Sequence, residues 1–166
     1  MLIIAHELRH IDQYRRGFSL SLQYDILEYV RQTFAVEADA QSFMIYLAWS
    51  LRRTGDETLW REVGGLEHYE DIVKAFDESM RSGASTLEAM RKAFTAWYAS
   101  PWRRAVYFEA AAMRYLDKRD SNHAIPTDKR LPHDHFDQLC RLPDGTNYGC
   151  QFTSEISSKV TGRPFP

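Results

Sequence analysis

Proline is absent from the first hundred residues of this chain, and five of its six prolines follow residue 125. Proline inside a helix removes a hydrogen bond and clashes with the preceding turn, so its absence permits long helices. Apolar side chains recur at helical spacing through most of the same region. The pattern predicts a mainly α fold, with a helical core over residues 1–119 and an irregular, Pro-rich tail over residues 120–166 that wraps over the helices.

Local signals divide this core into separate helices. Gly17 ends the first run, and Ser85 or Thr86 can cap a later helix with Glu88 as its capping-box partner. Pro101 suits the first turn of the last helix. In the tail, a turn signal at residues 144–145 can join two short strands in a hairpin. The expected helices cover residues 2–16, 24–53, a brief stretch from 56 to 64, 66–81, 86–100 and 101–119, and a short helix can form near 133–140.

Length and composition favour one domain of ordinary soluble type. The chain has 166 residues, 44% of them hydrophobic, and a formal net charge of −2 without a long basic run. Binding to nucleic acid or to an anionic membrane therefore has no support. No apolar run approaches the roughly 20 residues of a membrane helix, and charged residues at positions 6–10 argue against a signal peptide. We expect a cytoplasmic protein, in which Cys140 and Cys150 are free thiols rather than one loop disulfide.

The stretch HELRH at residues 6–10 is the strongest chemical signal. On a helix, His6 and His10 lie one turn apart on the same face and can bind one metal ion, while Glu7 points about 100° away and can reach a metal-bound water. An apolar stripe that includes Leu8 lies on one side of this helix and a polar stripe that includes Arg9 on another. The histidines fall on a third side, so we expect the rest of the protein to cover the apolar side and the histidines to face a separate cleft. The alternative is a pair of solvated histidines on an exposed edge.

The second expected helix supplies the best third ligand. Val30, Phe34, Glu37, Gln41 and Met44 share one helical face, so Glu37 is a carboxylate within a mostly apolar stripe. A buried unpaired carboxylate is costly, and metal coordination offsets that cost. If the two helices are antiparallel, Glu37 lies level with the His6 end of the pair.

Other roles for these residues stay open. Glu37 can instead form an ion pair with Arg9 or Arg31 at the helix–helix contact. Asp39 is better placed to accept a hydrogen bond from a ligand histidine than to bind metal itself. Glu109, also among apolar residues, is the rival third ligand.

The tail carries a weaker cluster of possible metal ligands. His133 and His135 lie two residues apart, with His123, Cys140 and Cys150 nearby in sequence. Their spacing matches no zinc pattern, so a solvated polar loop is the expected structure.

HELRH followed by EADAQ about 27 residues later resembles the gluzincin arrangement of zinc metallopeptidases. More narrowly, LIIAHELRHIDQ with VEADAQ resembles a group of bacterial proteins classed as metallopeptidases, over roughly the first 50 residues. The resemblance implies that His6, His10 and Glu37 bind Zn²⁺, that Glu7 is the catalytic general base, and that the substrate is a peptide or protein. Tyr14, Tyr24, His68 and Tyr107 are all chemically able to stabilise the oxyanion.

The chain departs from the zincin pattern at its start. In zincins a β-sheet precedes the active helix, and its edge strand pairs with the substrate backbone. Only MLIIA precedes His6, so we expect this sheet to be absent or truncated. The competing hypothesis is therefore an all-α metal-binding or regulatory interaction module without hydrolytic activity. The sequence leaves the oligomeric state open.

Overall fold

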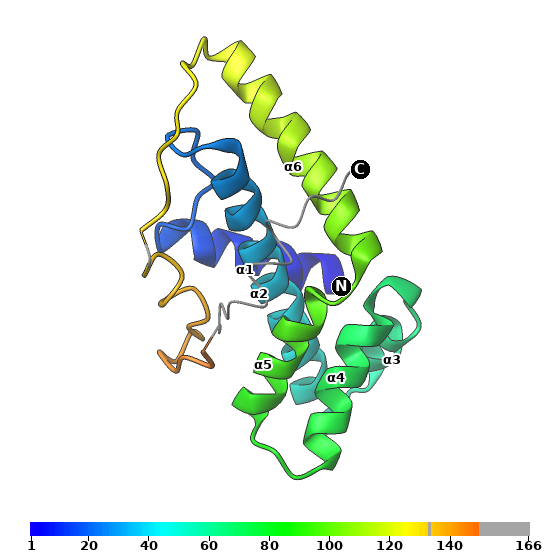
Figure 1. The fold of residues 1–166 in the computed structure, drawn as a ribbon. Coiled ribbons are helices and arrows are strands. Elements are labelled where there is room, and N and C mark those ends of the chain that lie inside the picture. Colours follow the sequence, from blue (N-terminus) through cyan, green and yellow to red (C-terminus); the bar gives the residue numbers. More distant parts are fainter. Residues whose placement is uncertain (133, 150–166) are drawn as a thin grey trace.

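The computed structural model describes residues 1–132 and 134–149, and these are mainly helical, as predicted (Figure 1). The only β pairing within these ranges is a single antiparallel bridge between Arg141 and Asn147, so the expected hairpin is reduced to one bridge around its turn. The elements are α1 (Leu2–Arg15), α2 (Ile26–Arg53), α3 (Thr58–Gly64), the short 3-10 helix η1 (Glu67–Tyr69), α4 (Glu70–Arg81), α5 (Thr86–Trp97) and α6 (Pro101–Ser121).

Side-chain caps fix the starts of three helices. The Asp25 carboxylate accepts from the backbone N–H of Glu28 at the start of α2, and the Ser85 hydroxyl accepts from the N–H of Glu88 at the start of α5. Ser100 caps α6 in the same way, with Pro101 in the first turn. Each cap satisfies an amide that lacks a helical partner. The helix expected over residues 66–81 is instead split into η1 and α4.

Helix α2 lies at the centre of the molecule and contacts α1, α3, α4, α5 and α6 (Figure 1). Large aromatic and aliphatic side chains from these helices form one buried cluster, each contributing roughly 1.5–3 kcal/mol on burial. Its fully buried members include Tyr29, Phe34, Met44, Ile45, Ile72, Phe76, Phe94, Trp97 and Tyr98. A rigid α2 therefore holds any site that its side chains help to form.

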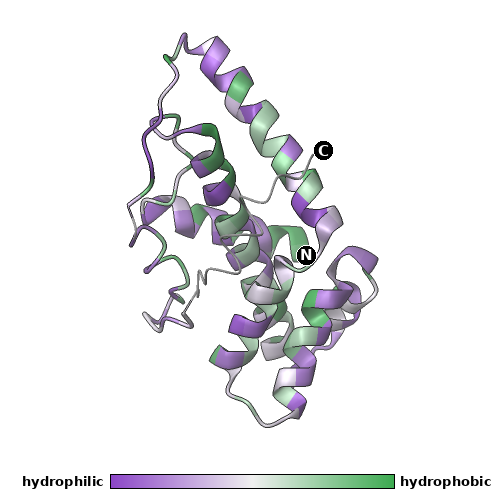
Figure 2. Cartoon of the chain, viewed as in Figure 1, coloured by the Kyte–Doolittle hydropathy of each residue, from purple (hydrophilic) through white to green (hydrophobic). Residues whose placement is uncertain are grey.

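Helix α1 crosses α2 rather than lying antiparallel to it (Figure 1). Its orientation about its own axis also differs from the expectation. Arg9, assigned to a polar stripe, is only 1% exposed, whereas Leu8 in the apolar stripe is 58% exposed. Figure 2 shows the apolar N-terminal part of α1, where Ile3 and Ile4 are exposed as well. The side of α1 that packs on α2 is thus mainly polar.

The described part of the tail packs against α1 and α2. Leu131, Phe136 and Leu139 join Phe18 and Val36 in a second, smaller buried cluster. Residues 134–140 form turns, so no helix occurs there, and residue 133 lies outside the described ranges. A single domain over residues 1–166 stays a prediction.

The solvated loop expected for the polar residues of the tail is found only in part: His123 is exposed, whereas His135 is half-buried and Cys140 is fully buried. The His135 ring packs against Phe18, Tyr24 and Phe136. Cys140 is disulfide-bonded, so the preference for free thiols is wrong at this position. His133 and Cys150 lie outside the described residues. None of the described helices is both long and apolar enough to cross a membrane, and cytoplasmic residence stays a prediction.

Candidate metal centre

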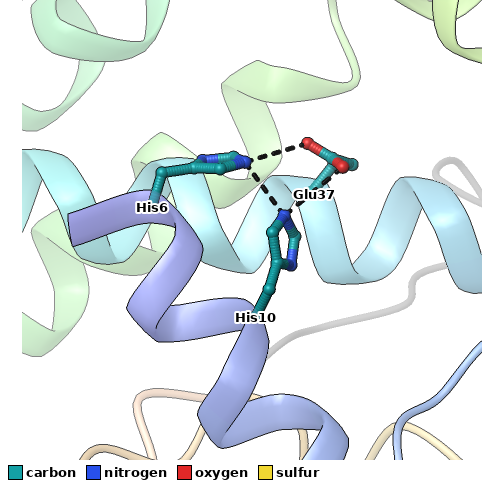
Figure 3. A group of neighbouring side chains, drawn as sticks. All are labelled: His6, His10 and Glu37. Atoms are coloured by element: carbon teal, nitrogen blue, oxygen red, sulfur yellow. Dashed lines mark hydrogen bonds and ion pairs between the residues drawn. The ribbon is translucent and has the colours of Figure 1, made fainter. Parts of the chain in front are cut away.

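Helices α1 and α2 bring His6, His10 and Glu37 together where they cross (Figure 3). The Nε2 atoms of the two histidines are 2.9 Å apart. His6 Nε2 lies 3.4 Å from Glu37 Oε2, and His10 Nε2 lies 3.4 Å from Glu37 Oε1. A tetrahedral ion with bonds of about 2.0–2.1 Å separates its ligand atoms by about 3.3 Å. The three donors therefore fit a single divalent ion.

The charges of these groups are strongly coupled. Burial opposes ionisation of Glu37, but hydrogen bonds from His10 and His6 and their positive charges outweigh it and lower the Glu37 pKa from 4.5 to about 2. Burial likewise opposes protonation of His10, but Glu37 outweighs it and raises the His10 pKa. Glu37 is consequently a carboxylate at neutral pH, which is the form that binds a cation.

Neither of the alternative roles for Glu37 is found. Arg9 pairs with Asp39, and Arg31 pairs with Glu28, so both arginines have other partners. Glu109, the rival ligand, is exposed on α6 and does not belong to the group that could hold a metal. Among the described residues, His6, His10 and Glu37 form the only such group.

The two histidines differ in how their second ring nitrogen is held. His10 Nδ1 lies 2.7 Å from Gln13 Oε1. His6 Nδ1 is buried and has no hydrogen-bond partner in the described part of the chain. Asp39 contacts His10 only through Gln13, whose Nε2 donates to the Asp39 carboxylate at 2.6 Å. The residue next to His10 is thus Gln13, with Asp39 behind it.

Sequence reasoning missed Gln13 and the partners of Asp39. Gln13 lies three residues after His10, a spacing at which helical side chains meet, and this spacing could have revealed it. Arg9 donates from Nε and Nη2 to the Asp39 carboxylate at 2.8 and 2.9 Å. Tyr148 of the tail donates from its hydroxyl to Asp39 at 2.7 Å. Nothing local in the sequence connects Tyr148 to this site.

The remaining predicted residues lie at different distances from the cluster. Glu7 is exposed on α1, and its charge contributes to the raised pKa values of His10 and Tyr14, so it lies beside the site. The Tyr14 ring stacks on His10, with ring centres 5.9 Å apart. Burial raises the pKa of Tyr107, and the nearby charge of Glu37 raises it further. Three of the predicted groups thus surround the cluster.

The other two oxyanion candidates have different surroundings. Tyr24 is buried in the smaller cluster, and its carbonyl accepts from the Tyr115 hydroxyl. The exposed His68 stacks on Trp102, with ring centres 4.4 Å apart. Tyr69, which no sequence motif singles out, has a pKa raised by burial and by the charge of Glu37. The charge of Glu37 therefore raises the pKa of three tyrosines around the site, which are Tyr14, Tyr69 and Tyr107.

A family model described as "Putative metallopeptidase family (DUF6782)" matches residues 1–150. The chain belongs to this family. Neither a curated protein nor a solved structure matches the chain. Membership implies a metal ion, and the donors described above are chemically suited to hold one.

Proposed function

We propose that the protein is a zinc-dependent metallopeptidase in which His6, His10 and Glu37 bind the zinc ion. The observation that carries this proposal is the convergence of two imidazole nitrogens and one carboxylate at separations that suit a tetrahedral ion. Two histidines and one glutamate are a donor set of catalytic zinc sites, which keep a further position open. Membership of a metallopeptidase family supports peptides or proteins as the substrate class.

Glu7 is the proposed general base. When bound, zinc lowers the pKa of water and polarises a peptide carbonyl. Glu7 accepts the proton from the attacking water and then delivers it to the leaving amine. Its exposed position beside the ligand histidines supports this role, because a base must reach substrate without binding the metal itself.

Tyr107 is the proposed oxyanion stabiliser. Its hydroxyl accepts a hydrogen bond from Gln41 Nε2 at 3.0 Å and also hydrogen-bonds the Glu37 carboxylate, so its O–H lies beside the proposed metal ligands. Burial and the charge of Glu37 raise its pKa, so the hydroxyl stays protonated and able to donate at physiological pH.

Metal analysis of the purified protein tests the ligand assignment. We expect about one zinc ion per chain, lost in His6→Ala and in Glu37→Ala but retained in Glu7→Gln. Glu109→Ala is the matched control, because it removes an exposed carboxylate and should retain zinc. Helical circular dichroism confirms that each variant is folded. A folded wild-type protein that binds no metal contradicts the proposal.

The second candidate function is a metal-binding interaction module without hydrolysis. The exposed apolar side of α1, formed by Ile3, Ile4, Leu8 and Ile11, favours it, because such surfaces often mark interaction sites. Incubation of the zinc-loaded protein with a broad peptide library separates the two. Cleavage by the wild type but not by Glu7→Gln supports the peptidase. An unchanged library supports the module.

A further inference from the structure

The Gln13 side chain is fully buried between the candidate ligand His10 and helix α2. Its Nε2 donates to the Val36 carbonyl at 2.8 Å and to the Asp39 carboxylate at 2.6 Å. Both of these partners are acceptors, so the NH₂ group must face them and Oε1 must face His10. The direction of the Gln13 amide is therefore determined by its surroundings.

This direction selects one form of the His10 ring. Gln13 Oε1 can only accept, so the His10 Nδ1 that lies 2.7 Å away must carry a proton. In the neutral imidazole, Nε2 is then deprotonated, and its lone pair faces His6 and Glu37. A histidine binds metal through such a lone pair. Gln13 thus holds His10 in the tautomer that the candidate site needs.

Asp39 in turn fixes Gln13, and both oxygens of its carboxylate are used. Oδ2 accepts from Arg9 Nε and Gln13 Nε2, and Oδ1 accepts from Arg9 Nη2 and Tyr148 Oη. Arg9, Asp39 and Tyr148 are all fully buried. Arg9 also donates to the carbonyls of Arg141 and Leu139 in the tail. The tail is thereby connected to the His10 ring through hydrogen bonds alone.

The cost of this arrangement points to a role beyond packing. Burying an ion pair removes two charges from water, and apolar side chains of similar volume often stabilise a fold as well. Directional bonds achieve what apolar side chains cannot, because they fix the orientation of an amide. Only the His10 ring is held in this way, because the buried His6 Nδ1 has no hydrogen-bond partner among the described residues.

We infer that Gln13 is a positioning residue that orients His10 for metal binding, and that Tyr148 of the tail locks Gln13 in place through Asp39. The inference rests on the proposed metal centre. Zinc affinity, measured by competition with a chelator, should fall about 10- to 100-fold in Gln13→Met. Tyr148→Phe removes a single hydroxyl and should lower the affinity several-fold.

Gln32→Met is the matched control, because Gln32 is a buried glutamine of α2 that hydrogen-bonds Ser21 and His135 rather than a candidate ligand. Its zinc affinity should equal that of the wild type. Nitrogen-15 NMR of the zinc-loaded protein supplies a readout that a purely structural role would not change. The His10 Nδ1 proton should exchange slowly in the wild type and much faster in Gln13→Met.

The outcomes separate the inference from the function on which it rests. A wild-type protein without zinc contradicts the proposed function and removes this inference with it. A zinc-loaded wild type combined with unchanged affinity in both Gln13→Met and Tyr148→Phe overturns the positioning role alone. Equal weakening in Gln32→Met and Gln13→Met also overturns it. If Gln13→Met does not fold, Tyr148→Phe decides, and an affinity equal to the wild type contradicts the inference.

Discussion

The two sides of α1 have the opposite character to those of an ordinary amphipathic helix. The side that packs on α2 and the tail carries Arg9, His10 and Gln13. The opposite side carries Ile3, Ile4, Leu8 and Ile11, which are 52–76% exposed. A helix of a globular protein normally buries its apolar stripe and exposes its polar one. Here directional bonds, rather than apolar burial, dominate the contact.

This difference shows what the contact between α1 and α2 is suited to do. Apolar contacts are non-directional and tolerate small rotations of a helix. The two-bond Arg9–Asp39 pair and the bond from Gln13 to the Val36 carbonyl do not, because each needs a defined geometry. They fix the rotation of α1 on α2, and this rotation sets the distance of the histidines from Glu37.

Replacing Arg9 is expected to produce the largest change. Arg9→Met leaves Asp39 buried without its cation, and removal of one partner of a buried pair costs about 3–5 kcal/mol. The free energy of unfolding, measured by urea denaturation of the wild type and the variant, tests this expectation.

Two further variants show whether the cost comes from the unpaired charge. Arg15→Met removes an exposed arginine of the same helix and should change stability by less than about 0.5 kcal/mol. The double variant Arg9→Met/Asp39→Leu should recover part of the loss, because no unpaired charge stays buried. An Arg9→Met protein as stable as Arg15→Met would show that the polar side does not hold α1.

The cluster of His6, His10 and Glu37 lies at the edge of the polar side of α1. We expect it to make an intermediate, pH-dependent contribution to the stability of the metal-free protein. The Glu37 pKa is lowered to about 2, so its stabilisation is present above its usual 4.5 and is lost as the pH falls through 2. The His10 pKa is raised, so its stabilisation is complete below its usual 6.5 and is lost as the pH rises through the raised value. Stabilisation by this cluster is thus greatest between pH 4.5 and 6.5.

Glu37→Gln removes both effects, because a neutral amide does not favour the charged imidazole. We expect the wild type to lose stability relative to this variant as the pH rises from 5.5 to about 8.5, because the stabilisation of protonated His10 by Glu37 is lost over that range. Urea denaturation in the presence of a chelator measures the difference. Glu109→Gln, at an exposed carboxylate, should follow the wild type at every pH. Parallel curves for Glu37→Gln and the wild type would contradict the coupling.

Much of the fold followed from local sequence signals. The cap at Ser85 and the first-turn Pro101 are short-range features that depend on neighbouring residues only, and both occur as predicted. The same holds for the pairing of His6 with His10, which requires only that they lie four residues apart on one helix. Glu37 was found because a carboxylate within an apolar stripe needs a partner. Its role as a metal ligand is a proposal.

The packing of α1 could not be predicted in this way. Periodicity shows that a helix has two sides, but it does not show which side its neighbours cover. That choice depends on Asp39 and Tyr148, which lie 30 and 139 positions from Arg9 in the sequence. Apolar residues were assigned to the buried side because burial usually favours them, and here the hydrogen-bonded ion pair took that place.

Substitutions on the apolar side of α1 are expected to have the smallest effect on stability. Leu8→Gln and Ile11→Gln replace exposed side chains, so each should change the free energy of unfolding by less than about 0.5 kcal/mol and leave zinc affinity unaltered. Ala5→Gln is the contrast on the buried side, where a longer side chain must displace its neighbours and should cost about 1–3 kcal/mol. Urea denaturation at two protein concentrations measures all three. A loss above about 2 kcal/mol in Leu8→Gln that grows with protein concentration would mean that copies of the chain cover this side in solution, and both sides of α1 would then be buried.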